Sequence, residues 1–250
     1  MLELRELTNE EYHADTTHIS ASQLKKIYSR GIWAWDQERN IPQEESPALV
    51  FGSAFHAYIL EPDLFLEQYA IIPDFGDGRT KAAKQAKELF YAQNATKTLL
   101  SDKDFQTIQC MAESFQAFIE EFELYEIWQD ALPEQSYFGL IGDTPIKIRY
   151  DKYSPKFNMC FDLKTTQDAS LNSFRWDIRK FHYDLQDYHY KQMADRFIIL
   201  AVEKKPPYLV QAYEIEDPTS GMMKWNEAIG LYNEYLQHGI APRNTQINMI

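Results

Sequence analysis

Two aspartates and a lysine stand close together in the sequence, where two short strands are expected to meet. Residues 146–151 and 159–164 both alternate apolar and polar side chains, which is the pattern of β-strands. Because side chains two positions apart on a strand share a face, Asp162 and Lys164 point the same way. A hairpin pairing of the two strands can bring Asp151 beside them. Two carboxylates with one ammonium can hold a hard divalent cation and orient an attacking water, which is the chemistry of metal-assisted phosphodiester hydrolysis.

An acid two residues before a lysine is common by chance, and a strand that carries this pair is most often a polar edge. Three further features support a site. His56 lies in an otherwise apolar predicted helix, where it is either a core histidine bonded to a backbone carbonyl or a metal ligand. Glu134 begins the first predicted strand. It is either a solvated strand end or an additional carboxylate near the metal site. Gln186 and Tyr190 share one face of a predicted helix, which is either an amphipathic rim or a polar ledge beside the site.

The composition is that of a folded protein. Of its 250 residues, 44% are hydrophobic and 14% aromatic, which argues against a disordered chain. No apolar run approaches the ~20 residues of a membrane span, and the charged N-terminus lacks the apolar segment of a signal peptide, so we expect a cytoplasmic protein. Cys110 and Cys160 stand far apart without a CxxC pair, which disfavours a disulfide framework, a zinc site and an iron–sulfur cluster.

The net charge of −13 argues at first against a nucleic acid partner, because phosphate binding requires Lys and Arg. Local patches matter more than the total, however. Basic residues cluster in three places, and each cluster taken alone is best explained as a solvated face. The clusters are Arg79, Lys81, Lys84 and Lys87; Lys147, Arg149 and Lys152; and Arg175, Arg179 and Lys180. Net charge therefore decides nothing about the partner.

The predicted elements form a single α/β (α+β) domain over residues 1–250, because no repeat or long flexible linker divides the chain. A helical N-terminal region (residues 1–130) precedes a sheet core, 131–217, and a C-terminal helix lies within 218–250. The periodicity predicts helices at 80–93, 102–127 and 219–237, a helical region at 168–196, and strands at 134–141, 145–151, 158–165, 197–203 and 208–215. A mixed sheet covered by helices is the expected architecture.

These positions, in this order, resemble a known family. The set consists of Phe-Gly-Ser-Ala-Phe-His at 51–56 and Leu-Glu-Pro at 60–62, then Glu134, Asp151, Asp-Leu-Lys-Thr-Thr at 162–166, and Gln186 with Tyr190. It looks like the RecE-type exonucleases of the PD-(D/E)XK superfamily, also called exodeoxyribonuclease VIII-like proteins, which are common in phages and prophages. The individual motifs are degenerate, but their order and spacing are specific. One departure is Tyr150, where the family usually has proline between arginine and aspartate.

The resemblance implies a PD-(D/E)XK nuclease core, in which a mixed central sheet is flanked by helices, with a metal site. By carry-over, His56, Asp151 and Asp162 would bind divalent metal, with the backbone carbonyl of Leu163 as a further ligand. Lys164 would position or activate the attacking water. Mg²⁺ is the expected ion, because an oxygen-rich site suits it, and Mn²⁺ would fit better if the histidine is a ligand.

The same resemblance implies roles around the metal. Glu134 would support the metal site or the wall that faces the phosphate. Gln186 and Tyr190 would hold the substrate strand, and Arg79 or Lys81 would contact phosphates.

The family also implies an activity and partners. The activity is 5′-to-3′ digestion of one strand of linear double-stranded DNA, which leaves 3′ single strands for recombination by annealing. The expected partner is a RecT-like single-strand annealing protein. Several copies of the chain would form a homo-oligomeric ring around the DNA, and no membrane is involved. In such a ring, an acidic exterior around a basic channel would reconcile the net charge of −13 with DNA.

Other interpretations remain open. A protein with a PD-(D/E)XK fold can be catalytically inactive and serve as a module that binds DNA or another protein. A CRISPR-associated nuclease with the same core is disfavoured by the two isolated cysteines, and a carboxylate-pair hydrolase such as a glycosidase is disfavoured by the acid-x-lysine strand. Two histidines outside the motifs, His182 and His189, are interpreted as helix surface or rim.

Overall fold

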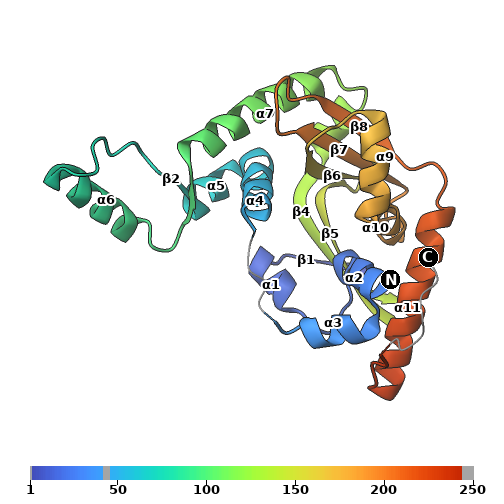
Figure 1. Ribbon diagram of the computed structural model, residues 1–250. Helices are drawn as coiled ribbons and strands as arrows, with labels where there is room; N and C mark the ends of the chain where they lie inside the picture. Colours follow the sequence, from blue (N-terminus) through green and yellow to red (C-terminus); the bar gives the residue numbers. More distant parts are fainter. Residues whose placement is uncertain (1, 42–45, 244–250) are drawn as a thin grey trace.

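A six-stranded mixed sheet forms the centre of the molecule (Figure 1). This computed structural model describes residues 2–41 and 46–243. The strands lie in the order β1 (Leu2–Arg5), β4 (Leu132–Ile141), β5 (Thr144–Ser154), β6 (Met159–Thr166), β7 (Arg196–Glu203) and β8 (Val210–Glu214). β6 and β7 run parallel, and the other neighbouring pairs are antiparallel. The expected mixed sheet flanked by helices is confirmed.

Helices cover both faces of this sheet and enclose two apolar cores. One core includes residues of α2 (Ala21–Arg30), α3 (Ile32–Glu38), α9 (Leu171–Lys180), α10 (Tyr183–Tyr190) and α11 (Thr219–His238). The other includes residues of α4 (Pro47–Leu60), α5 (Pro62–Gln68), α7 (Asp102–Glu121) and α8 (Tyr125–Asp130). Strand β7 contributes Phe197 and Ile199 to the first core and Ile198 and Leu200 to the second. Burial on both faces explains why β7 is a continuous apolar run in the sequence.

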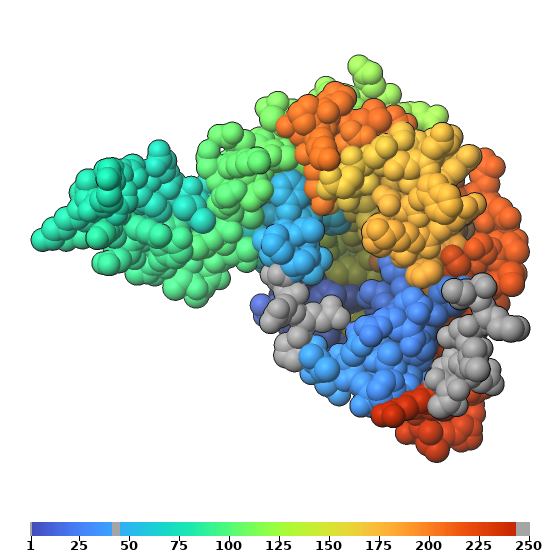
Figure 2. All heavy atoms as spheres, viewed as in Figure 1, coloured from blue at the N-terminus to red at the C-terminus, as the bar shows by residue number. Residues whose placement is uncertain are grey.

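The remaining elements lie at the periphery. Helix α1 (Asn9–Ala14) follows the edge strand β1. Strands β2 (Tyr69–Ile71) and β3 (Thr98–Leu100) form a separate two-stranded parallel sheet, connected through α6 (Lys81–Gln93). We call residues 69–100 the arm. It projects from the body of the molecule in both whole-molecule views (Figures 1 and 2).

The central sheet opens a fork between β5 and β6. These strands pair over three positions, and the last pair is Lys152 with Phe161. Beyond it β5 stays paired with β4 and β6 stays paired with β7, while β5 and β6 separate. Asp151 and Asp162 are the next residue on each strand. The fork therefore begins at the two aspartates.

The structure differs from the sequence prediction in two regions. The N-terminal region expected to be helical up to residue 130 also contains the strands β1, β2 and β3. The helix predicted at 102–127 is two helices, α7 and α8, separated by extended backbone at Phe122. This break lets Trp128 pack back against Phe115 of α7 and Phe161 of β6. The helical region predicted at 168–196 is confirmed as a pair of helices, α9 and α10, with a left-handed residue, His182, between them.

None of the helices formed by the described residues is both long enough and apolar enough to span a membrane.

Candidate active site

A cleft of about 560 Å³ lies at the fork. Its walls come from α1, α2, α4, α5 and α10 and from strands β2, β4, β5 and β6. Figure 2 shows the hollow between α4, α2 and α10. The lining includes eight of the residues that the sequence suggested for the site: His56, Glu134, Asp151, Asp162, Leu163, Lys164, Gln186 and Tyr190. The fold thus brings together side chains that are far apart in the chain.

Asp162 and Lys164 form an ion pair on β6, with 2.5 Å between Asp162 Oδ2 and Lys164 Nζ. This agrees with the expectation that side chains two positions apart share a face. Across the fork, Asp151 Oδ2 accepts a hydrogen bond of 2.7 Å from the backbone N–H of Leu163. Asp151 thereby satisfies a backbone donor that the opened ladder would leave unpaired. The three side chains expected to meet at the hairpin do meet here.

The buried charges of these residues influence one another. Burial raises the pKa of Asp151, and the charge of Asp162 adds to this effect, while His56 and Lys164 oppose it. For Lys164, burial would lower the pKa, but the two aspartates outweigh burial and raise the pKa above its ordinary value. Lys164 is therefore an ammonium at neutral pH.

Glu134 extends the row of carboxylates to a third strand. Its β4 neighbours Pro133 and Gln135 pair with Lys152 and Tyr150, which places Glu134 opposite Asp151. Its φ angle is +52°, a left-handed conformation that costs a non-glycine residue on the order of 1–3 kcal/mol and is typical of functional sites.

Arg149 is the cationic partner of Glu134. Its Nε donates to Glu134 Oε2 at 2.5 Å, and its Nη1 donates to Ser136 Oγ at 3.1 Å. Burial and the nearby Asp151 nevertheless raise the pKa of Glu134 to about 7. Glu134 is thus a carboxyl group that can exchange a proton near neutral pH.

Gln186 connects the carboxylates to a lysine that the sequence analysis missed. Gln186 Nε2 donates to Asp162 Oδ1 at 2.7 Å, and Gln186 Oε1 accepts from Lys25 Nζ at 2.9 Å. Both Lys25 and Lys164 also lie over the ring of Tyr183, at 5.3 and 5.4 Å from its centroid. Burial, together with the charge of Lys164, lowers the pKa of Lys25 to about 8.

Tyr190 holds α10 against the sheet. Its hydroxyl donates to the carbonyl of Arg149 at 2.8 Å, and the hydroxyl of Tyr150 donates back to the carbonyl of Tyr190 at 2.8 Å. Tyr150, the residue that departs from the family pattern, is therefore part of this connection. Contact of Tyr190 with a substrate strand stays a prediction.

The donors in the cleft fit a divalent cation in kind. His56 Nδ1 lies 3.5 Å from Asp151 Oδ2, so an imidazole joins the carboxylates as expected. Asp162 Oδ2 is buried and is ion-paired with Lys164 Nζ at 2.5 Å. A cation at this oxygen would compete with Lys164. Within residues 2–41 and 46–243, no three His, Cys, Asp or Glu side chains are grouped closely enough to form a metal site as they stand.

Two predicted substrate contacts lie elsewhere. Arg79 forms an exposed ion pair with Asp77 in the arm, and Lys81 is exposed at the first turn of α6. Neither lines the cleft, so a contact of these residues with phosphates stays a prediction.

The interpretation of His189 as helix surface or rim is wrong. The ring is fully buried: its Nδ1 accepts from the indole of Trp225, and its Nε2 faces the carbonyl of Lys147 at 3.1 Å. Burial lowers its pKa to about 4, so it is a neutral core histidine. His182 is partly buried at the start of α10, edge-on to Tyr28.

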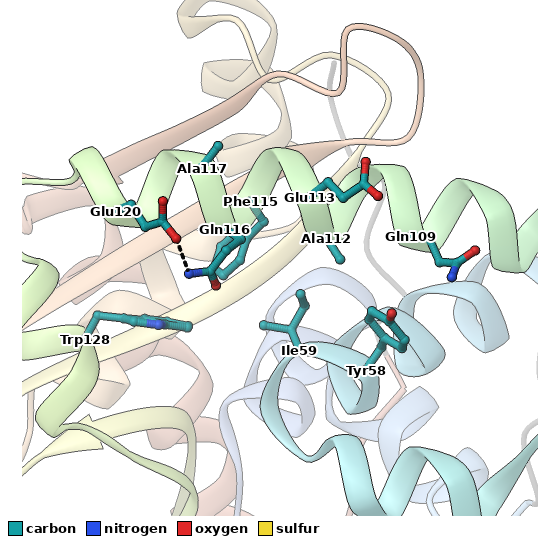
Figure 3. Close-up of a pocket in the computed structure, with 10 residues that line it drawn as sticks. All are labelled: Tyr58, Ile59, Gln109, Ala112, Glu113, Phe115, Gln116, Ala117, Glu120 and Trp128. Atoms are coloured by element: carbon teal, nitrogen blue, oxygen red, sulfur yellow. Dashed lines mark hydrogen bonds between the residues drawn. The ribbon is translucent and has the colours of Figure 1, made fainter.

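A second hollow, of about 580 Å³, lies between α4, α7 and α8 (Figure 3). Its polar groups are the exposed carboxylates and amides of α7, such as Glu120, which accepts a hydrogen bond from Gln116. No lysine, arginine or histidine is among the described residues that line it. The paired acid and base groups of the first cleft are missing here, so the first cleft is the candidate active site.

The chain is similar to known proteins in sequence profile and in fold. The profile of the family described as "PDDEXK-like domain of unknown function (DUF3799)" matches residues 20–248. Among solved structures, a candidate exonuclease from Eubacterium rectale is 17% identical, with a TM-score of 0.59 and coverage of 97% of each chain. A phage related exonuclease from Haemophilus somnus 129PT is 12% identical, with a TM-score of 0.37 and coverage of 87% of this chain and 92% of that chain. No curated protein matches the chain.

Proposed function

The chain belongs to this family of PDDEXK-like domains, and from that premise we propose that it hydrolyses phosphodiester bonds of DNA with the help of a divalent cation. One observation carries the proposal. Glu134, Asp151 and Asp162 stand on three adjacent strands at the fork, and Lys164 is ion-paired with the last of them. A fold of the nuclease type can be degenerate, but here each position that the chemistry needs holds a suitable side chain.

The residues of the cleft divide into cation ligands and phosphate-facing groups. Asp151 and Asp162, with His56 beside them, would hold the cation. When bound, a divalent cation makes water more acidic and neutralises charge on the phosphate. Lys164, which lies beside Asp162 on the same face of β6, would position or activate the attacking water.

For the substrate we infer linear double-stranded DNA, digested exonucleolytically in the 5′-to-3′ direction. The inference rests on the resemblance of the motifs to the RecE-type exonucleases, which implies the substrate and the polarity, and on the exonuclease description of a structurally similar protein. The 3′ single strands that remain would serve a RecT-like annealing protein, and several copies of the chain would form a ring around the DNA. Mg²⁺ is the proposed ion, with Mn²⁺ as a substitute.

A digestion assay with end-labelled linear duplex tests the proposal. Wild type should release 5′-label before 3′-label with Mg²⁺ or Mn²⁺ and none with EDTA, and should leave closed circular DNA intact. Asp162→Asn and Lys164→Ala should each reduce the rate by about 10²-fold or more, because each removes a group that acts on the reacting phosphate. Lys156→Ala is the matched control, since Lys156 is exposed in the turn at the opposite end of β6 and should not affect the rate.

Three outcomes of this assay would contradict parts of the proposal. Equal digestion by wild type and both site variants would show that the activity comes from elsewhere. Binding of DNA without digestion under any metal would favour the alternative of a catalytically inactive binding module. Release of 3′-label first would reverse the polarity and leave the chemistry in place.

A further inference from the structure

The outer face of α9 combines cations with exposed aromatic rings. Arg175, Trp176, Arg179 and Lys180 are all exposed, and their spacing places them on one side of the helix. Trp176 is 69% exposed, which is unusual for a tryptophan. Phe181, which follows the helix, is 44% exposed. We call these five residues the α9 platform. An exposed ring beside cations can stack against a flat group of a ligand.

The α9 platform is basic in an acidic chain. The one acid of α9, Asp177, turns away from it and accepts a hydrogen bond of 2.9 Å from Thr166 Oγ1. Three cations thus remain on the outer face without an acid of α9 beside them, while the chain as a whole carries −13. The guanidinium of Arg179 lies 5.5 Å from the Trp176 ring centroid, and the ammonium of Lys180 lies 5.0 Å from that of Phe181. The positive charges are held next to the rings.

Ring contacts connect the α9 platform with the cleft. The ring centroid of Phe181 is 5.7 Å from that of Tyr183, and the two rings are tilted by 33°. Tyr183 lines the cleft and lies beneath Lys164. Phe181 of the α9 platform therefore lies next to a residue that lines the cleft.

We propose that the α9 platform binds single-stranded DNA adjacent to the active site, with bases stacked on Trp176 and Phe181 and phosphates paired with the three cations. This proposal rests on the proposed function, because the strand would be a segment of the nuclease substrate or product. Exposed ring faces and neighbouring cations are the two groups that bind single strands without sequence preference. A duplex would use the cations alone, since its base faces are hidden except at the ends. A single strand therefore accounts for both features.

Binding is tested with the full-length protein and a fluorescein-labelled oligo-dT of about 20 nucleotides, in EDTA so that no cleavage occurs. Fluorescence anisotropy should show that Trp176→Ala weakens binding about tenfold, whereas Trp176→Phe retains most of it, because a ring remains for stacking. The double variant Arg179→Ala/Lys180→Ala should reduce the slope of log K against log salt concentration by about 1.4, since two phosphate contacts are lost.

The controls match exposure and charge. Leu66 is 69% exposed on α5, as Trp176 is on α9, so Leu66→Ala removes an equally accessible apolar side chain. Lys103→Ala/Lys156→Ala removes two exposed cations remote from α9. Neither control should weaken binding more than twofold. Thermal unfolding monitored by circular dichroism should show that all variants are folded.

Wild-type affinity in the Trp176→Ala variant would overturn the proposal, as would an equal loss in the Leu66→Ala control. If Trp176→Ala instead lowers the mass measured by sedimentation and leaves DNA binding unchanged, the α9 platform contacts a second copy of the chain and the proposal is wrong. The end-label assay on wild type separates this result from the proposed function. If wild type digests DNA and Trp176→Ala binds single strands as wild type does, the proposal for the α9 platform is wrong and the proposed nuclease function stands. If Trp176→Ala weakens binding but wild type does not digest DNA, the proposed nuclease function is wrong and the proposal for the α9 platform stands.

Discussion

Two neighbouring residues of α10, Asp187 and His189, are fully buried and respond to pH in opposite directions. Asp187 is ion-paired with Lys191, whose Nζ lies 2.9 Å from Asp187 Oδ1. Burial raises its pKa from 3.8 to about 6. Burial lowers the pKa of His189 from 6.5 to about 4. Each residue therefore favours its neutral form in the folded protein.

Asp187→Asn should stabilise the protein at neutral and alkaline pH. Between pH 3.8 and 6 the folded protein binds a proton at Asp187 that the unfolded chain does not, so stability falls as pH rises through this window. The shift corresponds to about 2–3 kcal/mol. Urea unfolding should find the variant more stable than wild type by about this amount at pH 8 and nearly equal at pH 4.

His189 makes the same variant informative at acid pH. The contribution of neutral His189 to the free energy of unfolding is lost as pH falls from 6.5 towards 4. In wild type this loss offsets the gain in stability that comes from protonation of Asp187 over the same pH range. Stability of Asp187→Asn should therefore rise from pH 4 to 6.5, where that of wild type stays flatter. A variant less stable than wild type at pH 8 would mean that the ion pair with Lys191 outweighs the burial of the carboxylate.

At the scale of residues, the sequence predicts the relative orientation of side chains that are close together along the chain. The period of two in β6 was sufficient to place Asp162 and Lys164 on one face. Lys25 reaches Gln186 across 161 positions, and nothing in its surroundings in the sequence indicates that contact. The left-handed backbone of Glu134 also lacks the glycine or asparagine that usually reveals it. Tertiary contacts decide both features.

At the scale of elements, the contact between α10 and α11 depends on Gly221. A Cβ at this position would lie 2.1 Å from the carbonyl oxygen of Asp184. The side chain of the same Asp184 accepts hydrogen bonds from Ser220 and Lys224, at 2.7 and 2.6 Å. The first turn of α11 is therefore fixed against α10, close behind the residues that line the cleft.

Gly221→Ala should destabilise the protein by about 3 kcal/mol or more, because the added methyl group meets backbone that cannot move away. Gly230→Ala is the matched control on the same helix. It has no neighbouring atom within 4 Å, and alanine there should stabilise by about 0.5–1 kcal/mol through its higher helix propensity. Urea unfolding of both variants gives the comparison. Equal stabilities would show that α11 can shift.

The elements predicted correctly are those with a strong local period. Such patterns occur in β4, β5, β6, β7 and α11, and the structure places these elements within a few residues of the predicted ends. Strand β1 was missed because its four residues form a strand through pairing with β4, a segment more than 100 positions away. The break between α7 and α8 was missed because no glycine or proline marks it.

At the scale of the whole molecule, helix α6 of the arm is largely exposed. Of the thirteen residues of α6, Ala83 is buried, and an isolated helix of this length is marginally stable in water. The exposed face carries Lys81, Lys84 and Lys87, whereas the chain has a net charge of −13. A basic arm and an acidic body are complementary, as copies in the proposed ring would require.

The proposed ring predicts a mass that depends on the arm. Light scattering of wild type should give one mass that is a whole-number multiple of the mass of a single chain. Lys84→Glu/Lys87→Glu should lower it, because the arm would then repel an acidic neighbour. Lys103→Glu/Lys156→Glu makes the same charge change outside the arm and should leave the mass unaltered. A wild-type monomer that digests DNA processively would exclude the ring, and the fork of Asp151 and Asp162 would then be sufficient within one chain.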